Sequence, residues 1–131
     1  MSTYHLQIVT PDGQFFDGNA ERLIVRAIDG EVCIMPRHAA YISALATGEA
    51  RVTIEGKVRR AACSGGMITV TGDDVRLVAT TFEWKENIDA GRAAAAKEKA
   101  EQMLKNAKDD REIEMAKAKL SRALNRMKVA Q

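Results

Sequence analysis

The fold is decided by the segment ATTFEWKENIDAGRAAAAKEKA, residues 79–100, within which the composition of the chain changes. β-Branched and aromatic residues, which favour strands, give way there to alanine, lysine and glutamate, which favour helices. Eight of the nine glycines, both prolines and all three phenylalanines precede Trp84, whereas no proline or aromatic residue follows it. We therefore predict a β domain over residues 1–84 and a helical region over residues 85–131.

Short apolar segments alternate with turn residues throughout the predicted β domain. Leu6 and Ile8 share one face of a first strand, and Pro11-Asp12-Gly13 ends it. Many short strands with frequent turns favour an antiparallel β-sandwich or flattened barrel. A parallel sheet is not favoured, because no helix-length segment separates the strands. The remaining predicted strands cover 22–28, 32–35, 50–54, 58–63, 67–70 and 75–81, with Ser64-Gly65-Gly66 as a break.

Helical spacing replaces this pattern after Trp84. Asn87 is the predicted N-cap of a helix that ends near Lys105, and Asp109 with Glu112 resembles a capping box that starts a second helix. Because a short polar link joins the two helices, we predict an antiparallel hairpin. The apolar stripes are Ala96, Ala100, Met103, Leu104 and Ala107 on the first helix and Ile113, Ala116, Leu120, Ala123, Leu124 and Met127 on the second.

Large apolar side chains are few in this hairpin. It is therefore expected to depend on the β domain or on a partner for its stability. Composition alone fits two behaviours equally: a hairpin that docks and undocks, and a hairpin that is permanently docked.

Charge and hydropathy exclude several classes of protein. The formal net charge of +2 over 131 residues is too small to indicate a nucleic-acid binder, and the basic helical half has no aromatic residue for base stacking. No uncharged apolar run approaches the ~18 residues of a membrane span. The N-terminal segment has no basic residue before Arg22, so it resembles neither a secretory signal nor a transit peptide.

The sequence gives little support to an enzyme that acts alone. It contains no G-x-S-x-G, no H-E-x-x-H and no P-loop. Its two histidines and two cysteines are scattered, so they do not have the spacing of metal ligands. A nucleophilic Cys33 or Cys63 assisted by His38 stays open as a rival hypothesis, although buried structural thiols are commoner.

Two segments carry candidate functional residues. In GEVCIMPRHAAYISAL, residues 30–45, Pro36 and Arg37 interrupt an apolar run. This segment is either two strands joined by a proline turn or a loop that presents Met35, Arg37 and His38 to a partner.

The second segment is IDAGRA, residues 88–93, at the start of the first predicted helix. Asp89 and Arg92 are neighbours on one helix face, as an ordinary capping carboxylate and its neighbour would be. Arg122 and Arg126 would approach Arg92 if the hairpin folds back fully. Three converging guanidinium groups suggest an anion or phosphate site, and a solvated basic face is the alternative.

Taken in order, these motifs resemble the epsilon subunits of the rotary F-type ATP synthase. The resemblance runs nearly end to end. It rests on Val9-Thr10-Pro11-Asp12-Gly13, on residues 30–45, on Ser64-Gly65-Gly66 and on residues 88–93. It implies the fold predicted above, a β-sandwich followed by a two-helix hairpin.

The resemblance also implies a function. The chain would be a non-catalytic central-stalk subunit whose sandwich binds the gamma subunit and rests on the ring of c subunits. Its hairpin would either fold against the sandwich or extend along gamma toward the alpha and beta subunits, the state associated with inhibition of ATP hydrolysis. It would lie peripherally at the cytoplasmic face of a bacterial membrane, or at the equivalent face for an organelle-encoded chain. The resemblance implies no nucleic-acid partner, metal or required cofactor.

Specific residues follow from the same resemblance. In some bacterial members the folded hairpin binds ATP as a regulatory ligand through an I/L-D-x-x-R-A motif. Glu31 and His38 match loop positions that face the c ring or gamma, so we predict a partner-binding loop of Glu31, Met35, Arg37 and His38. The residues of the predicted ATP site are Ile88, Asp89, Arg92 and Ala93, which match the motif, with Glu83, Arg122 and Arg126 as further participants.

The chain departs from the family at several positions. Cys33 and Arg37 stand where glycine is usual, and Tyr41 replaces an aliphatic residue. Lys99 lies where nucleotide-binding relatives use arginine, and lysine lacks the planar fork that grips phosphate. Weak or absent ATP binding is therefore one expectation, and an adaptor with a permanently docked helical pair and no nucleotide response is the alternative function.

Overall fold

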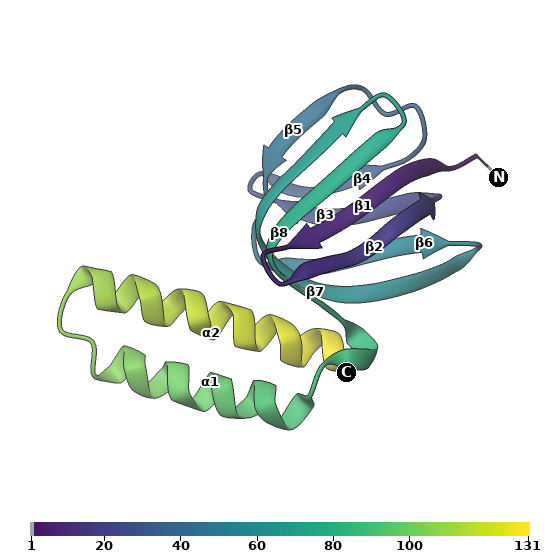
Figure 1. Ribbon diagram of the computed structural model, residues 1–131. Coiled ribbons are helices and arrows are strands. Elements are labelled where there is room, and N and C mark those ends of the chain that lie inside the picture. Colours follow the sequence, from purple (N-terminus) through teal and green to yellow (C-terminus); the bar gives the residue numbers. More distant parts are fainter. Residues whose placement is uncertain (1) are drawn as a thin grey trace. The chain divides into compact units, whose positions relative to one another are not determined.

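The computed structural model describes residues 2–131, which form two compact units. The first unit ends at Trp84, and the second spans Lys85–Gln131. The first contains eight strands and the second two α-helices. Figure 1 labels these elements. The predicted order of a β-sandwich followed by an antiparallel helical hairpin is therefore confirmed.

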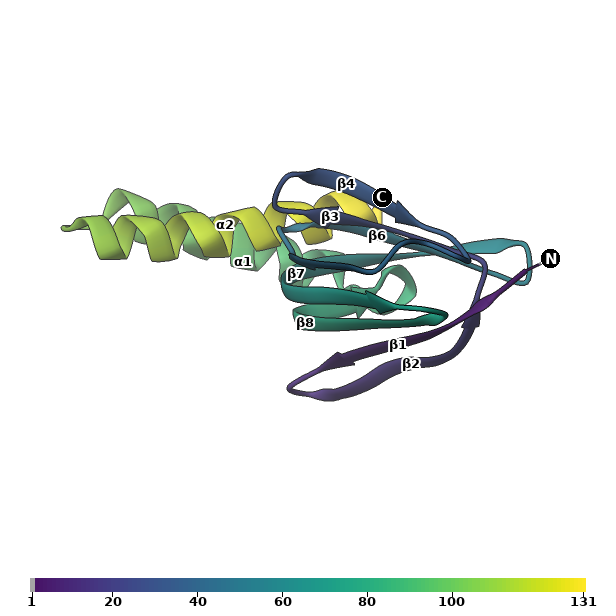
Figure 2. The same cartoon turned by 90° about the horizontal axis from the view of Figure 1, so that it is seen from above.

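The strands of the first unit form one sheet that curls into two layers, seen edge-on in Figure 2. The sheet order is β2-β1-β8-β7-β6-β3-β4, and β5 pairs with β7. Every pairing is antiparallel except that of β1 with β8, which is parallel. The strands are β1 (Tyr4–Thr10), β2 (Gly13–Ala20), β3 (Arg22–Ala27), β4 (Gly30–Ile34), β5 (Tyr41–Ala44), β6 (Gly48–Ile54), β7 (Lys57–Thr71) and β8 (Asp74–Trp84).

The core lies between the two layers. Leu6 and Ile8, predicted to share a face, are both fully buried. They pack in one cluster with Leu23, Val52 and Leu77 from three other strands. Alternate residues along each strand thus supply the apolar interior, as a half-buried strand requires.

Two features of the sheet differ from the prediction. β7 does not break at Ser64-Gly65-Gly66 but runs from Lys57 to Thr71, and it keeps one register with β8 from Ala61 to Thr71. Gly65 and Gly66 adopt positive φ angles of 69° and 99°, so they bend the strand while it stays paired. The strand β2 was not predicted because its Asp17, Gly18 and Asn19 have low strand propensity; its pairing with β1 outweighs that propensity.

The second unit begins with a 3₁₀ turn, η1 (Lys85–Asn87), followed by α1 (Ala90–Lys105) and α2 (Asp110–Ala130). The N-cap of α1 is Asp89 rather than the predicted Asn87, because the 3₁₀ turn occupies the preceding residues. Asp109 caps α2 as predicted, since its Oδ1 accepts a hydrogen bond of 2.8 Å from the backbone N–H of Glu112. The Glu112 carboxylate in turn accepts from the Lys108 N–H rather than from the cap residue.

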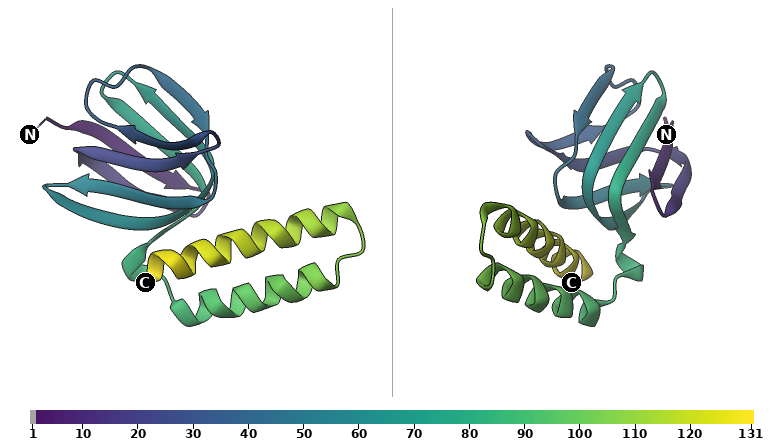
Figure 3. Two further views of the ribbon diagram at one scale, coloured as in Figure 1. Left: turned by 180° about the vertical axis from the view of Figure 1, so that it is seen from behind. Right: turned by 60° about the vertical axis from the view of Figure 1, so that its left-hand side comes forward.

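Small side chains form the seam between the two helices, whose antiparallel course is clear in Figure 3. Leu124, predicted to lie in the apolar stripe, is 45% exposed, because its neighbour Ala123 takes the seam position. One residue turns a helix by about 100°, so Leu124 is directed well to the side of the seam that Ala123 occupies. The buried residues of the helices are Ala93, Ala100, Ala116, Ala123 and Val129.

Candidate functional site

The loop between β4 and β5 presents three of the predicted partner-binding residues. Met35 and Arg37 are exposed, and His38 is partly buried. The His38 backbone N–H donates to the Met35 carbonyl at 3.2 Å, and its Nδ1 donates to the Ala39 carbonyl at 2.7 Å. Arg37 at the turn has a φ of 66°, the left-handed region that disfavours side chains with a Cβ. The loop is thus a tight turn with an arginine at its strained position.

Glu31, the fourth predicted residue, does not lie in this loop. It lies in β4 opposite Arg26 of β3, and its Oε2 is 3.3 Å from Nη2 of Arg51 on β6. Met35 lies four positions further along the chain, about 13 Å away in an extended strand. The structure therefore brings Met35, Arg37 and His38 together and places Glu31 in a separate charged group.

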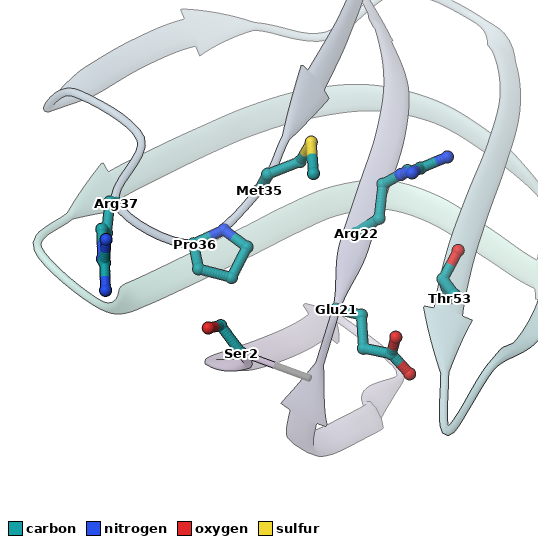
Figure 4. Close-up of a pocket in the computed structure, with 7 residues that line it drawn as sticks. All are labelled: Ser2, Glu21, Arg22, Met35, Pro36, Arg37 and Thr53. Carbon is teal, nitrogen blue, oxygen red and sulfur yellow. The ribbon is translucent and has the colours of Figure 1, made fainter.

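A hollow of about 340 Å³ lies beside the loop. Figure 4 shows Met35 and Pro36 between the side chains of Arg37 and Arg22. Glu21 is buried at its wall, and its Oε1 accepts a hydrogen bond of 2.7 Å from the Gly56 N–H. No sequence pattern marks Glu21, Arg22 or Thr53 as members of a site, since they lie outside the loop segment. The residues that line the hollow are Ser2, Glu21, Arg22, Met35, Pro36, Arg37 and Thr53.

Apolar side chains gather on one outer face of the sheet. Ala44, Met67 and Val78 lie side by side in register on β5, β7 and β8. Ile42 lies two residues from Ala44 and so shares its face. Ile42 is 64% exposed, Met67 46% and Val78 42%. We call these four residues the apolar strip. No single sequence segment predicts it, because its members come from three strands.

The predicted ATP residues of the hairpin lie at one end of it. Arg92 lies 13 residues before the end of α1, and Ala123 lies 13 residues after the start of α2, so the two are level in antiparallel helices. Arg122 and Arg126 flank that level within about 5 Å along the helix axis. The structure thus brings the three arginines to the same end of the hairpin.

The other motif residues have structural roles at the same end. Asp89 Oδ1 accepts a 3.0 Å hydrogen bond from the Arg92 backbone N–H, which fixes the first turn of α1. Ala93 is buried, and Ile88 is partly buried. Glu83 lies in β8 opposite Ala62 of β7 and belongs to the first unit. Six of the seven predicted residues therefore belong to one helical unit.

The first unit also contains two titratable groups, His5 and Cys63, whose pKa values are raised by their surroundings. His5 is hydrogen-bonded to two carboxylates, those of Asp17 and, at 3.1 Å, Asp74. The hydrogen bond to Asp17, with that to Asp74, raises the pKa of His5. Cys63 is buried, and burial raises the pKa of its thiol to about 12, so it is not a thiolate nucleophile at neutral pH. Cys33 is exposed.

Comparison with known proteins gives matches over both units. Residues 3–85 match the family model for the β-sandwich domain of the ATP synthase delta/epsilon chain, and residues 86–131 match the model for its long α-helix domain. The ATP synthase epsilon chain of Shouchella clausii is 42% identical over 130 residues, covering 99% of this chain and 96% of the relative. That of Caldicellulosiruptor bescii is 37% identical over 131 residues, covering 100% and 96%.

A solved structure shares the fold. A chain in the Euglena gracilis mitochondrial ATP synthase (OSCP/F1/c-ring) superimposes with a TM-score of 0.79 at 22% identity, covering 92% of this chain and 77% of that chain. Over the described residues 2–131, neither helix is long and apolar enough to cross a membrane.

Proposed function

Because the chain belongs to the epsilon-subunit family of the F-type ATP synthase and is a non-catalytic subunit of that complex, we propose that it couples parts of the rotor in the central stalk and regulates ATP hydrolysis through its hairpin. The β-sandwich binds the gamma subunit and rests on the c ring. The hairpin alternates between a compact state and an extended state that reaches the alpha and beta subunits. The chain lies peripherally, at the cytoplasmic face of a bacterial membrane.

The observation that carries the coupling role is the exposed apolar strip. Ile42, Met67 and Val78 expose large apolar side chains on neighbouring strands, where a chain that acts alone would favour polar ones. Burial of such side chains against gamma supplies association free energy of about 25 cal/mol per Å². The loop between β4 and β5, which contains Pro36 and is called the Pro36 loop below, faces the c ring or gamma at another position of the sandwich, as does Glu31.

The regulatory role rests on the arginines at one end of the hairpin. Arg92, Arg122 and Arg126 come from both helices, so a phosphate bound among them links α1 to α2. Ala93 keeps the helices close at this end, and Asp89 holds the first turn in place. A ligand shifts an equilibrium only by its differential affinity for the two states. ATP bound by the compact hairpin, with Glu83 and Ile88 as further contacts, therefore favours the compact state.

Lys99 limits the strength of this site. It is exposed on α1 two turns beyond Arg92, about 10 Å along the helix. Its ammonium group attracts phosphate without bidentate contacts. We therefore expect an affinity near the millimolar range, about 4 kcal/mol of binding free energy.

Reconstitution with the catalytic core tests both roles. We expect ATP hydrolysis to be lower with the full-length chain than with a chain truncated after Trp84, and calorimetry of the full chain to detect ATP binding. Equal hydrolysis rates together with no binding at millimolar ATP would favour the alternative, an adaptor with a permanently docked hairpin and no nucleotide response.

A further inference from the structure

The hollow beside the Pro36 loop combines apolar surface with two arginines. Met35 and Pro36 form the apolar part, and Arg22 and Arg37 lie on either side of it (Figure 4). Both arginines are exposed. Neither guanidinium has a hydrogen-bond or ion-pair partner among residues 2–131, whereas Arg51 and Arg60 of the same unit are paired with glutamates. The hollow therefore holds two exposed cationic groups that are available to a partner.

The buried carboxylate of Glu21 offsets only one of the two positive charges of the hollow. Glu21 directs Oε1 to the Gly56 N–H at 2.7 Å, and its backbone N–H donates to the Thr53 carbonyl at 2.8 Å. Its Oε2 is shielded from solvent. Glu21 thus fastens the β6–β7 turn, and an incoming group meets the guanidinium groups and the hydroxyls of Ser2 and Thr53 first.

The backbone conformation of Arg37 also supports a binding role for its side chain. A residue with a Cβ at a φ of 66° costs free energy that glycine would avoid. Strained residues persist where the surrounding structure or function holds them. The strained turn at Arg37 places its guanidinium beside the hollow, on the far side of Pro36 from Arg22.

We propose that this hollow receives an acidic side chain of a partner subunit of the rotor, with its carboxylate between Arg22 and Arg37. An apolar residue next to that carboxylate covers Met35 and Pro36. Guanidinium groups bind carboxylates through paired, charge-assisted hydrogen bonds, and two of them neutralise the buried charge without further groups. The assignment rests on the proposed function, because it identifies the chemistry by which the sandwich recognises its rotor partner.

The test measures binding of the full-length chain to the detergent-solubilised complex that lacks this subunit. We expect Arg37→Gly and Arg22→Gln each to weaken binding at least tenfold at low salt. The matched control is Lys57→Gln, which removes a positive charge beside the β6–β7 turn and outside the hollow. It should change binding less than twofold. Glycine tolerates a positive φ, so Arg37→Gly should leave the thermal midpoint unchanged or raise it.

Each of the other outcomes contradicts the proposed acidic partner, and each indicates a different cause. If wild type associates but Arg37→Gly and Arg22→Gln bind as it does, the acidic partner is wrong and the proposed function stands. If Lys57→Gln loses as much affinity as the two arginine variants, bulk charge and not a positioned pair is responsible. If phosphatidylglycerol vesicles bind wild type and not Arg37→Gly, while the detergent complex binds both equally, the occupant is a lipid headgroup. If wild type fails to associate, both proposals fall.

Discussion

Replacement of Gly66 by alanine tests the account of β7 as one strand bent within the sheet. A Cβ at Gly66 would lie 1.9 Å from the carbonyl oxygen of Val78 and 2.8 Å from the Cα of Ala79, both backbone atoms of β8. Neither atom can move unless the β7–β8 ladder moves with it. The φ of 99° adds conformational strain of about 1–3 kcal/mol for a residue with a Cβ. Distortion of two or three ladder hydrogen bonds adds about 1 kcal/mol each.

We therefore expect Gly66→Ala to lower the free energy of unfolding of the first unit by about 3–6 kcal/mol. The matched control is Gly56→Ala, because Gly56 also has a positive φ, 77°, but no heavy atom lies within 4 Å of an added Cβ. That change should cost only about 1–2 kcal/mol. The difference between the two variants isolates the steric contact with β8.

Urea unfolding followed by tryptophan fluorescence measures both variants. The chain has a single tryptophan, Trp84, which is buried in the core of the first unit against Phe82. Equal destabilisation by Gly66→Ala and Gly56→Ala would contradict this expectation. It would mean that β8 shifts away from β7 at negligible cost and that the close backbone approach does not constrain the sheet.

Three further predictions follow from single residues. Because the pKa of His5 is raised in the folded chain, protonated His5 stabilises the fold at pH values below its unfolded pKa of about 6.5, and this contribution is lost as pH rises through the folded pKa. In urea unfolding, the stability advantage of wild type over His5→Gln should therefore shrink from pH 6 to pH 9. An advantage that stays constant over this range would contradict the prediction. Arg92→Ala should weaken ATP binding in calorimetry much more than Lys97→Ala, and equal losses would indicate bulk charge. Iodoacetamide at pH 8 should alkylate exposed Cys33 rapidly and leave buried Cys63 unmodified in the folded chain, as peptide mass analysis can show; rapid labelling of both would contradict the burial.

Local patterns predicted much of the fold. Two predicted features, the shared face of Leu6 and Ile8 and the N-cap at Asp109, depend only on residues close in sequence, and both are present in the structure. The existence of β2 depends on β1, which pairs with it along its whole length and outweighs a poor local propensity. The choice of Asp89 over Asn87 as N-cap depends on a 3₁₀ turn that the spacing did not indicate.

The candidate sites were predictable only where one segment carries them. The loop arginine and the motif of residues 88–93 could be identified because they lie in short segments with unusual residues. The hollow joins Arg37 to Arg22 and Thr53 from other strands, and the apolar strip joins three strands. Which residues of different strands lie side by side depends on the strand register. The alternation of apolar and polar residues within one segment does not specify that register.

The course of β7 has a mechanical consequence. Its first half pairs with β6 and its second half with β5, so one backbone belongs to both layers of the sandwich. A shearing force on either layer is then transmitted along covalent bonds as well as across side-chain contacts, and the layers cannot slide apart without stretching that strand. A part subjected to torque gains stiffness from such a continuous tie.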